Sequence, residues 1–225
     1  MAHGTLSSID DAAFLRGGNL IAIGDGSPGG WELLQFRDAT LVSPGTWELG
    51  HRLRGQLGTD AATSGQWPAG SWVVVMNGTP RQIELRSRHL RQERHFRIGP
   101  ARKLVEDSTY VHQVHRFEGN GLRPYSPVHL RADGHGPVRQ FSWIRRTRID
   151  GDDWDLPEVP LGEETEVYEI RVLQYGETVR TVTRSSADWT YDPEWDGLTG
   201  HYAVTVAQVS ARYGAGPVAK LELFA

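Results

Sequence analysis

Short segments of alternating apolar and polar residues run through most of this chain, and glycine or proline separates one segment from the next. Alternation with a period of two is the pattern of a half-buried β-strand, whereas an amphipathic helix repeats about every 3.6 residues. The 225 residues include 26 glycines and 12 prolines, which favour turns and interrupt helices. The sequence therefore predicts an all-β protein. Its apolar runs are too short for a membrane span.

The N-terminal part, residues 1–132, is expected to be a β-rich domain with one short helix. Ser8 has the spacing of a helix N-cap, and Gly17-Gly18 ends the helix. The Asn77-Gly78 pair is a strong signal for a β-hairpin. The strands expected here are residues 19–23 and 31–36 around a glycine-rich loop, and residues 72–76 and 82–85 around Asn77-Gly78.

The C-terminal part, residues 136–225, is expected to be a separate β-sandwich. A glycine- and proline-rich stretch at 119–127 is interpreted as a hinge, because its X-Pro steps disfavour helix and central strand. The domain boundary is placed between Val128 and Gly136. The expected sandwich strands are residues 139–145, 167–173, 178–183, 202–209 and 218–223.

These C-terminal residues resemble a fibronectin type III module. Phe141-Ser-Trp143 matches the second strand of that family with its buried tryptophan. The pattern from Tyr202 to Gly214, with valines at 204, 206 and 209, matches the sixth strand and the turn behind it. Leu198 suits the tyrosine corner, in which the Tyr202 hydroxyl would bond to upstream backbone. The resemblance implies a fold and leaves function open.

Charge is distributed unevenly along the sequence. Residues 1–134 carry 15 basic and 13 acidic side chains, whereas residues 135–225 carry 9 and 15. Arginines and histidines crowd together at Arg86, Arg88, His89, Arg91, Arg94, His95 and Arg97. This cluster is interpreted as an anion-binding face, or as a solvated strand face or an interface to an acidic partner. A nucleic-acid partner is not expected, because only Phe96 offers a stacking ring within the run.

Several motifs have residue types that suit catalytic, cofactor or metal chemistry, but none predicts such a site. Gly24-x-Gly26-x-x-Gly29 has the letters of a dinucleotide fingerprint, but a strand follows where the helix should begin. His112 and His115 lie on an expected strand and point to opposite sides. The acidic loop 150–155 could gather carboxylates around calcium, but it departs from the EF-hand pattern and is interpreted as a solvated turn. The chain has no cysteine. No catalytic residue, cofactor or metal is therefore assigned.

Tryptophan is abundant, with eight residues. Trp143 is expected in the sandwich core, and Trp72 is a candidate core residue. Aromatic residues in expected sandwich loops form a possible glycan-binding or partner surface together with the first arginines of the basic run, because sugars pack on flat exposed rings. That surface comprises Trp154, Trp189, Tyr191, Trp195, Arg86, Arg88 and Arg91. The alternative is that these rings attach the loops to the sandwich or pack on a neighbouring domain.

Nearly the whole chain resembles the C-terminal end of the large tail-tip protein of gene transfer agents and related siphophage-like tails. The matching stretches are residues 24–29, 31–39, 51–60, 110–114, 121–129 and 142–151. The resemblance implies a fragment of a multidomain baseplate hub protein that is a trimer at full length. The glycosidase-like domain of that family lies outside this chain, so its activity is not implied.

The resemblance implies a non-enzymatic structural component of the virion tail tip, which assembles with other tail-tip and baseplate proteins and contacts the host cell. No signal peptide is visible, so synthesis in the bacterial cytoplasm is expected. One alternative is a carbohydrate- or receptor-binding module that recognises host surface glycans. A polysaccharide or cell-wall hydrolase is a further alternative that no motif supports.

Overall fold

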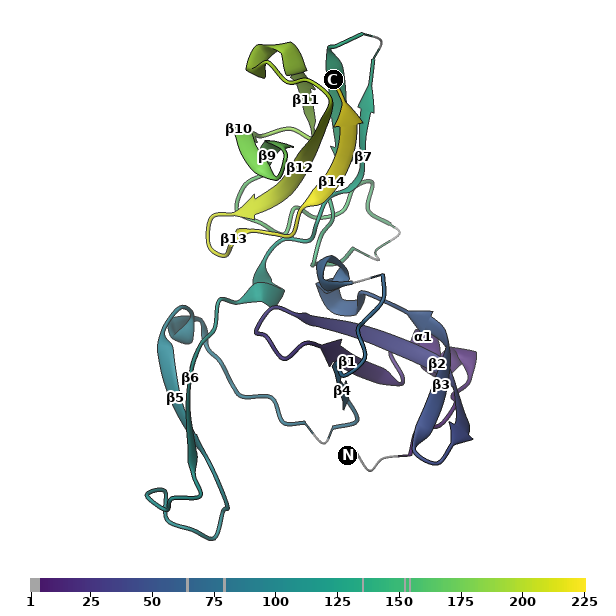
Figure 1. The fold of residues 1–225 in the computed structure, drawn as a ribbon, viewed down its shortest axis with the longest axis vertical. Coiled ribbons are helices and arrows are strands. Elements are labelled where there is room, and N and C mark those ends of the chain that lie inside the picture. Colours follow the sequence, from purple (N-terminus) through teal and green to yellow (C-terminus); the bar gives the residue numbers. More distant parts are fainter. Residues whose placement is uncertain (1–4, 64, 79, 135, 152, 154) are drawn as a thin grey trace. The chain divides into compact units, whose positions relative to one another are not determined.

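The computed structural model describes residues 5–63, 65–78, 80–134, 136–151, 153 and 155–225. The described chain is built from β-strands, with one short α-helix (Figure 1). It divides into two compact units, Met1–Glu84 and Leu85–Ala225. The prediction of an all-β protein with one short helix is confirmed.

Four antiparallel strands form the sheet of the first unit, in the order β3-β2-β1-β4. Their bounds are β1 Leu20–Gly24, β2 Trp31–Ser43, β3 Thr46–Leu53 and β4 Trp72–Val75. The buried residues Ile21, Leu34 and Phe36 form the core on one face of this sheet. Gly24 lies opposite Trp31 in the β1–β2 ladder. The glycine-rich stretch is therefore a strand–loop–strand connection, as predicted.

Helix α1 (Asp11–Leu15) begins later than the sequence suggested. Its N-cap is Asp10, whose carboxylate accepts a hydrogen bond from the Ala13 N–H at 2.7 Å. Ser8, the predicted cap, instead accepts a hydrogen bond from the backbone N–H of Ala39 on β2 at 3.0 Å. Both residue types cap helices well, so the contact of Ser8 with the sheet decides which one does so here.

The hairpin predicted around Asn77-Gly78 does not form. Within the described chain, β4 pairs only with β1, and residues 81–86 are in no strand. The ladder places Val75 opposite Ile21 and Val73 opposite Ile23, and Val75 packs on the core of the first unit. A turn signal specifies a change of direction, whereas burial against β1 selects the partner strand.

A buried carboxylate connects β2 to the loop that leads to β4. The side chain of Glu32 has no solvent exposure. It accepts hydrogen bonds from Arg54 Nε at 2.9 Å, Arg54 Nη2 at 2.6 Å, Trp67 Nε1 at 2.7 Å and the Gly55 N–H at 3.1 Å. Burial opposes ionisation, but the hydrogen bonds from Arg54 and Trp67 outweigh it and lower the pKa of Glu32. This cluster fastens residues 54–67 to the sheet.

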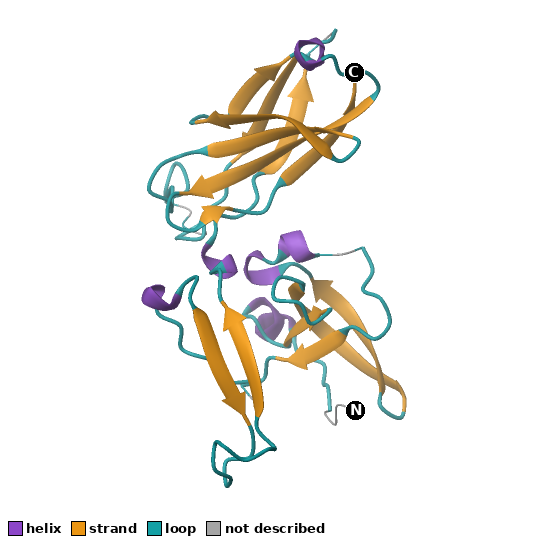
Figure 2. Ribbon diagram, turned by 60° about the vertical axis from the view of Figure 1, so that its left-hand side comes forward, coloured by secondary structure: helices purple, strands orange, loops and turns teal. Residues whose placement is uncertain are grey.

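The second unit contains a two-layered sandwich preceded by a hairpin, β5 (Glu93–Ile98) and β6 (Val111–Arg116). One layer of the sandwich consists of β7 Val128–Asp133, β8 Arg139–Ile144 and β11 Asp188–Tyr191. The other consists of β10 Glu177–Arg184, β9 Tyr168–Gln174, β12 His201–Ser210 and β14 Ala219–Phe224, with the short β13 Gly214–Ala215 beside β12 (Figure 2). Three strands against four, in this connection order, make a fibronectin type III-like sandwich, as predicted. Short 3-10 helices occur at Gln56–Gly58, Asp60–Ala62, Ser87–His89, Asn120–Leu122 and Pro193–Asp196.

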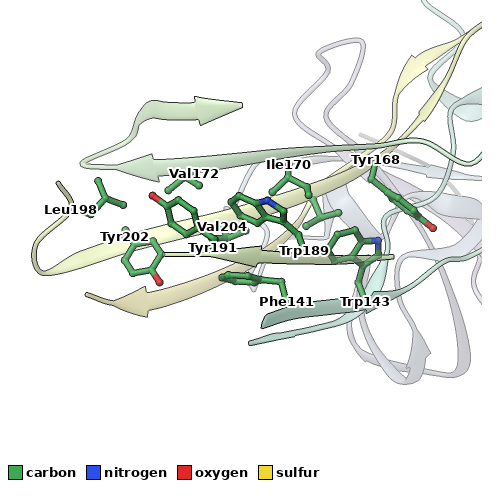
Figure 3. Packing of buried hydrophobic residues seen from close by; sticks show 11 residues of the cluster. Phe141, Trp143, Tyr168, Ile170, Val172, Trp189, Tyr191, Leu198, Tyr202 and Val204 are labelled. Carbon is green, nitrogen blue, oxygen red and sulfur yellow. The ribbon is translucent and has the colours of Figure 1, made fainter. Parts of the chain in front are cut away.

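Aromatic rings fill the space between the two layers (Figure 3). Trp143 is buried and its ring meets that of Tyr168 edge-on, with centroids 5.2 Å apart. The prediction that Trp143 is a core residue is confirmed. Tyr202 and Leu198 are also buried. The Tyr202 hydroxyl, however, has no hydrogen-bond partner among the described residues, so the hydrogen bond of the predicted tyrosine corner is not formed.

The sandwich begins at Val128, at the start of the interval Val128–Gly136 in which the sequence placed the domain boundary. Strand β7 pairs with β8, so Val128–Asp133 belongs to the sandwich sheet. The preceding stretch, interpreted from sequence as a hinge, also packs: Pro124 is fully buried. The Arg146 guanidinium lies 4.9 Å from the centre of the Tyr125 ring. Prolines restrict the backbone of a packed segment as well as that of a flexible one.

A glycine in the connection after β13 allows this packing. A Cβ atom on Gly216 would lie 2.2 Å from the carbonyl oxygen of Pro124. We therefore expect Gly216→Ala to destabilise the second unit by roughly 1–3 kcal/mol, because backbone must move to relieve the contact. Hydrogen exchange of residues 119–127 should become faster. Gly121→Ala is the matched control, since nothing lies within 4 Å of its added Cβ; equal exchange in the two variants would contradict the prediction.

Candidate interaction surfaces

Two of the aromatic residues assigned to an exposed glycan surface are core residues. Trp189 and Tyr191 lie on β11, with exposed fractions of 7% and 0%. Their rings stack on each other with centroids 4.8 Å apart. Their assignment to an exposed loop is corrected. The alternation Asp188-Trp189-Thr190-Tyr191 was the available sequence signal, since it is a four-residue strand pattern with both rings on one face.

Trp195 differs from these two residues, because 59% of its surface is exposed. It lies in the 3-10 helix Pro193–Asp196, whose N-cap Asp192 accepts a hydrogen bond from the Glu194 N–H at 2.9 Å. The Trp195 ring touches the edge of the Tyr191 ring. Of the aromatic residues assigned to the glycan surface, Trp195 is the exposed one within the described chain, and Trp154 lies outside the described residues.

The position of the 3-10 helix carrying Trp195 is fixed by an ion pair with the neighbouring sheet. Arg180 on β10 donates two hydrogen bonds to the Asp196 carboxylate, at 2.6 and 2.7 Å, and the Tyr191 hydroxyl donates a third at 2.8 Å. The hydrogen bonds from Arg180, and less strongly that from Tyr191, hold the pKa of Asp196 below its usual value. Burial of the Tyr191 hydroxyl, and its hydrogen bond to Asp196, raise the pKa of Tyr191. These hydrogen bonds attach the 3-10 helix to β10 and β11.

In the first unit, Trp72 is not a core residue. Its side chain is 65% exposed on β4, although the sequence made it a candidate for the core. Gly26 lies beside it, since a Cβ on Gly26 would be 3.5 Å from Trp72 Nε1. The neighbouring Val73 and Met76 are exposed as well. The edge strand β4 therefore presents apolar side chains to solvent.

The three arginines assigned from sequence to the glycan-binding or partner surface precede the β5–β6 hairpin. Arg86, Arg88 and Arg91 are all exposed, and Arg88 belongs to the 3-10 helix Ser87–His89. Arg91 Nε lies 3.6 Å from Glu118, and its backbone N–H donates to the Phe117 carbonyl. These three arginines are not aligned on one strand face. The exposed cationic residues continue into the hairpin itself.

The hairpin brings together residues that sequence analysis treated separately. Its strands pair in register from Glu93↔Arg116 to Ile98↔Val111. The rings of His95 and His112 stack with centroids 5.2 Å apart, and His95 Nδ1 and His112 Nε2 are hydrogen-bonded at 3.0 Å. The prediction that His112 and His115 lie on a strand is confirmed. Arg116, which was not assigned to the basic cluster, ends β6 and pairs with Glu93 of β5. Extending the strand expected at His112 and His115 by one residue would have included it.

The described residues form no metal-binding cluster and no membrane-spanning helix. In the described ranges, no three His, Cys, Asp or Glu side chains gather as metal ligands. Asp152, which belongs to the acidic loop considered for calcium, lies outside those ranges. No described helix is long and apolar enough to cross a membrane. Exposed features of the described residues include the basic hairpin, the β4 edge and Trp195.

Comparison with known proteins gives a partial match at the sequence level. Residues 1–74 match the family model "Rcc01698-like, C-terminal". The match covers the first unit up to β4. No curated protein matches the chain.

Matches to solved structures are weak in both sequence identity and TM-score. Domains d3-d4 of the rat CD45 extracellular region match with a TM-score of 0.36 and 11% identity, over 84% of this chain and 94% of that chain. The FN1-FN3 domains of chicken CNTN1 match with a TM-score of 0.33 and 18% identity, over 60% and 44% of the two chains. The spore cortex lytic enzyme SleM of Clostridium perfringens matches with a TM-score of 0.31 and 13% identity, over 45% of this chain and 28% of that chain. At such low TM-scores, the fold assignment depends on the strand topology described above. Over its first 74 residues the chain is thus similar to the Rcc01698-like C-terminal family.

Proposed function

We propose that this chain is a non-enzymatic structural component of the tail tip or baseplate of a phage-like particle, of the gene transfer agent type. The observation that carries the proposal is the match of residues 1–74 to the Rcc01698-like C-terminal family. The sequence resemblance to tail-tip proteins, which extends over nearly the whole chain, gives additional support. The proposal includes that, in the particle, the chain is part of a longer hub protein that forms a trimer.

The proposed mechanism is geometric. A packed β-sandwich and a connecting segment that packs through the buried Pro124 keep a fixed shape under load better than a flexible tether does. The first unit is stiffened by the buried Glu32–Arg54 pair at 2.6 Å. Rigid modules of this kind hold neighbouring tail proteins in register and present exposed side chains to them. Contact with the host cell would follow from the position at the tail tip.

Epitope tagging of the encoded full-length protein tests the proposal. We expect the tag to co-purify with intact particles and to be located at the tail end by immunogold labelling. Particles from a strain in which the segment encoding these 225 residues is deleted should be defective in tail assembly or in delivery of DNA to the host cell. A tag absent from purified particles would contradict the proposal. Hydrolysis of peptidoglycan or capsule by the purified chain would contradict its non-enzymatic character.

A further inference from the structure

The β5–β6 hairpin is a two-stranded ribbon with little internal burial. Its strands pair with each other and with no further strand of the described chain. All six residues of β6 are exposed, and Glu93, His95, Arg97 and Ile98 of β5 are exposed as well. A two-stranded hairpin is at best marginally stable in water unless something packs on it. The hairpin therefore has the properties of a segment that is covered in an assembly.

Apolar side chains lie among the charges on this ribbon. Ile98 and Val111 are directly opposite in the ladder and each is 57% exposed. On the other face, Val114 is 46% exposed between His112 and Arg116. The rings of Phe96 and Phe117 meet edge-on, with centroids 6.1 Å apart. Arginine and aromatic residues are enriched at protein–protein interfaces, and the exposed Ile98, Val111 and Val114 add apolar surface to them.

The charge of the hairpin region is opposite to that of the rest of the chain. Residues 86–116 carry eight basic and three acidic side chains, a formal charge of +5, whereas the whole chain has −4. Arg91 and Arg116 pair with Glu118. Arg94, Arg97 and Arg102 have no carboxylate partner among the described residues. Their guanidinium groups are available to carboxylates on another molecule.

We propose that the β5–β6 hairpin docks on the surface of a second protein of the particle, at a site where carboxylates surround an apolar patch. This inference rests on the proposed function, because it takes the partner from the same tail assembly. Ile98 and Val111, which lie opposite each other in the ladder, favour a protein over a polyanionic glycan or nucleic acid, because a protein surface can cover these β-branched side chains with an apolar patch. The arginines steer the partner and fix its orientation, while the apolar residues supply the buried centre of the contact.

The chain allows a precise cross-linking test, because Lys103 and Lys220 are its only lysines. Arg97→Lys keeps the charge and places an amine on the hairpin. Carbodiimide treatment of purified particles should then join residue 97 to an Asp or Glu of another tail protein, identified by mass spectrometry. Arg184→Lys, which places an amine on the exposed end of β10, is the matched control and should give no such product. A hairpin product on the same chain, or none in particles that contain the variant, would overturn the inference.

Two further variants separate an interface from simple charge attraction. We expect Arg97→Glu to reduce incorporation of the chain into particles roughly tenfold, with the loss partly masked at high salt. Ile98→Ser should reduce incorporation by a similar factor at every salt concentration, because burial of apolar surface is not screened. The matched Arg184→Glu should leave incorporation unchanged, and circular dichroism should show all variants folded.

The possible results distinguish the two proposals. If the wild-type chain is absent from particles, the proposed function fails. If the chain is present and Arg97→Glu and Ile98→Ser are incorporated normally, only the docking inference fails. Retention of the purified chain on heparin or duplex DNA that Arg97→Glu abolishes and Ile98→Ser leaves intact would show a polyanion site and would also overturn the inference.

Discussion

Replacement of Trp189 by alanine is expected to destabilise the sandwich by about 3–5 kcal/mol, the usual cost of removing a large buried aromatic side chain. The Trp189 ring is 7% exposed and packs between Tyr191 and Phe141, with ring centroids at 4.8 and 5.6 Å. Alanine leaves a cavity beside both rings. Urea unfolding measures the loss, and hydrogen exchange of β12 amides shows that it occurs in the sandwich.

Trp195→Ala is the matched control, since the same residue type is 59% exposed six positions later. We expect it to change the free energy of unfolding by less than about 1 kcal/mol. This pair of variants decides between the two interpretations of the aromatic residues. If Trp189→Ala left stability unchanged and abolished binding on a glycan array, Trp189 would face solvent and the glycan-binding hypothesis would be restored.

Glu32→Ala is expected to destabilise the first unit by about 3–5 kcal/mol, because it leaves the partly buried Arg54 without its carboxylate partner. The Trp67 N–H and the Gly55 N–H would lose their acceptor in the same variant. Glu32→Gln keeps the shape and part of the hydrogen bonding, so its cost should be smaller. The measurement is hydrogen exchange of β1 and β2 amides, with β9 amides of the second unit as an internal reference.

Because of Glu32, we expect the stability of the first unit to depend on pH in the acid range. The pKa of Glu32 is lower in the folded protein than its usual value, so its contribution to stability is complete above the ordinary glutamate pKa of about 4.3 and is lost as pH falls through the lowered value. The difference in protection between wild type and Glu32→Gln should therefore shrink as the pH is lowered below about 4. If the difference in protection between wild type and Glu32→Gln stayed the same from pH 7 to below about 4, Glu32 would not act as a carboxylate.

Much of the strand content follows from local pattern. Five expected sandwich strands correspond to β8, β9, β10, β12 and β14 within a few residues. Each contains a run of alternating residues whose apolar members face the core, so the segment itself carries the signal. Strand β11 is shorter and lies next to Pro193, and β7 lies next to a proline-rich stretch. Both were missed because turn signals dominated their surroundings.

The face of a side chain and the partner of a strand depended on contacts far along the chain. Trp189 and Trp195 both looked like loop residues, and pairing of β11 with β8 placed only the first in the core. Glu32 read as the polar member of an alternating strand, yet donors from residues 54, 55 and 67 allow its burial. The expected hairpin partner of β4 was replaced by β1.

The basic run at 86–97 was visible in the sequence, but its cross-strand neighbours were not. His112 and Arg116 join that surface only because β5 and β6 pair in one register. The sequence by itself determined the all-β class, the fibronectin type III-like strand pattern and the charge of each segment, because these depend on local composition and period. The tertiary structure decided which rings are buried, which carboxylate is enclosed and which histidines lie opposite Arg94 and Arg97, because strand register assigns every side chain to a face.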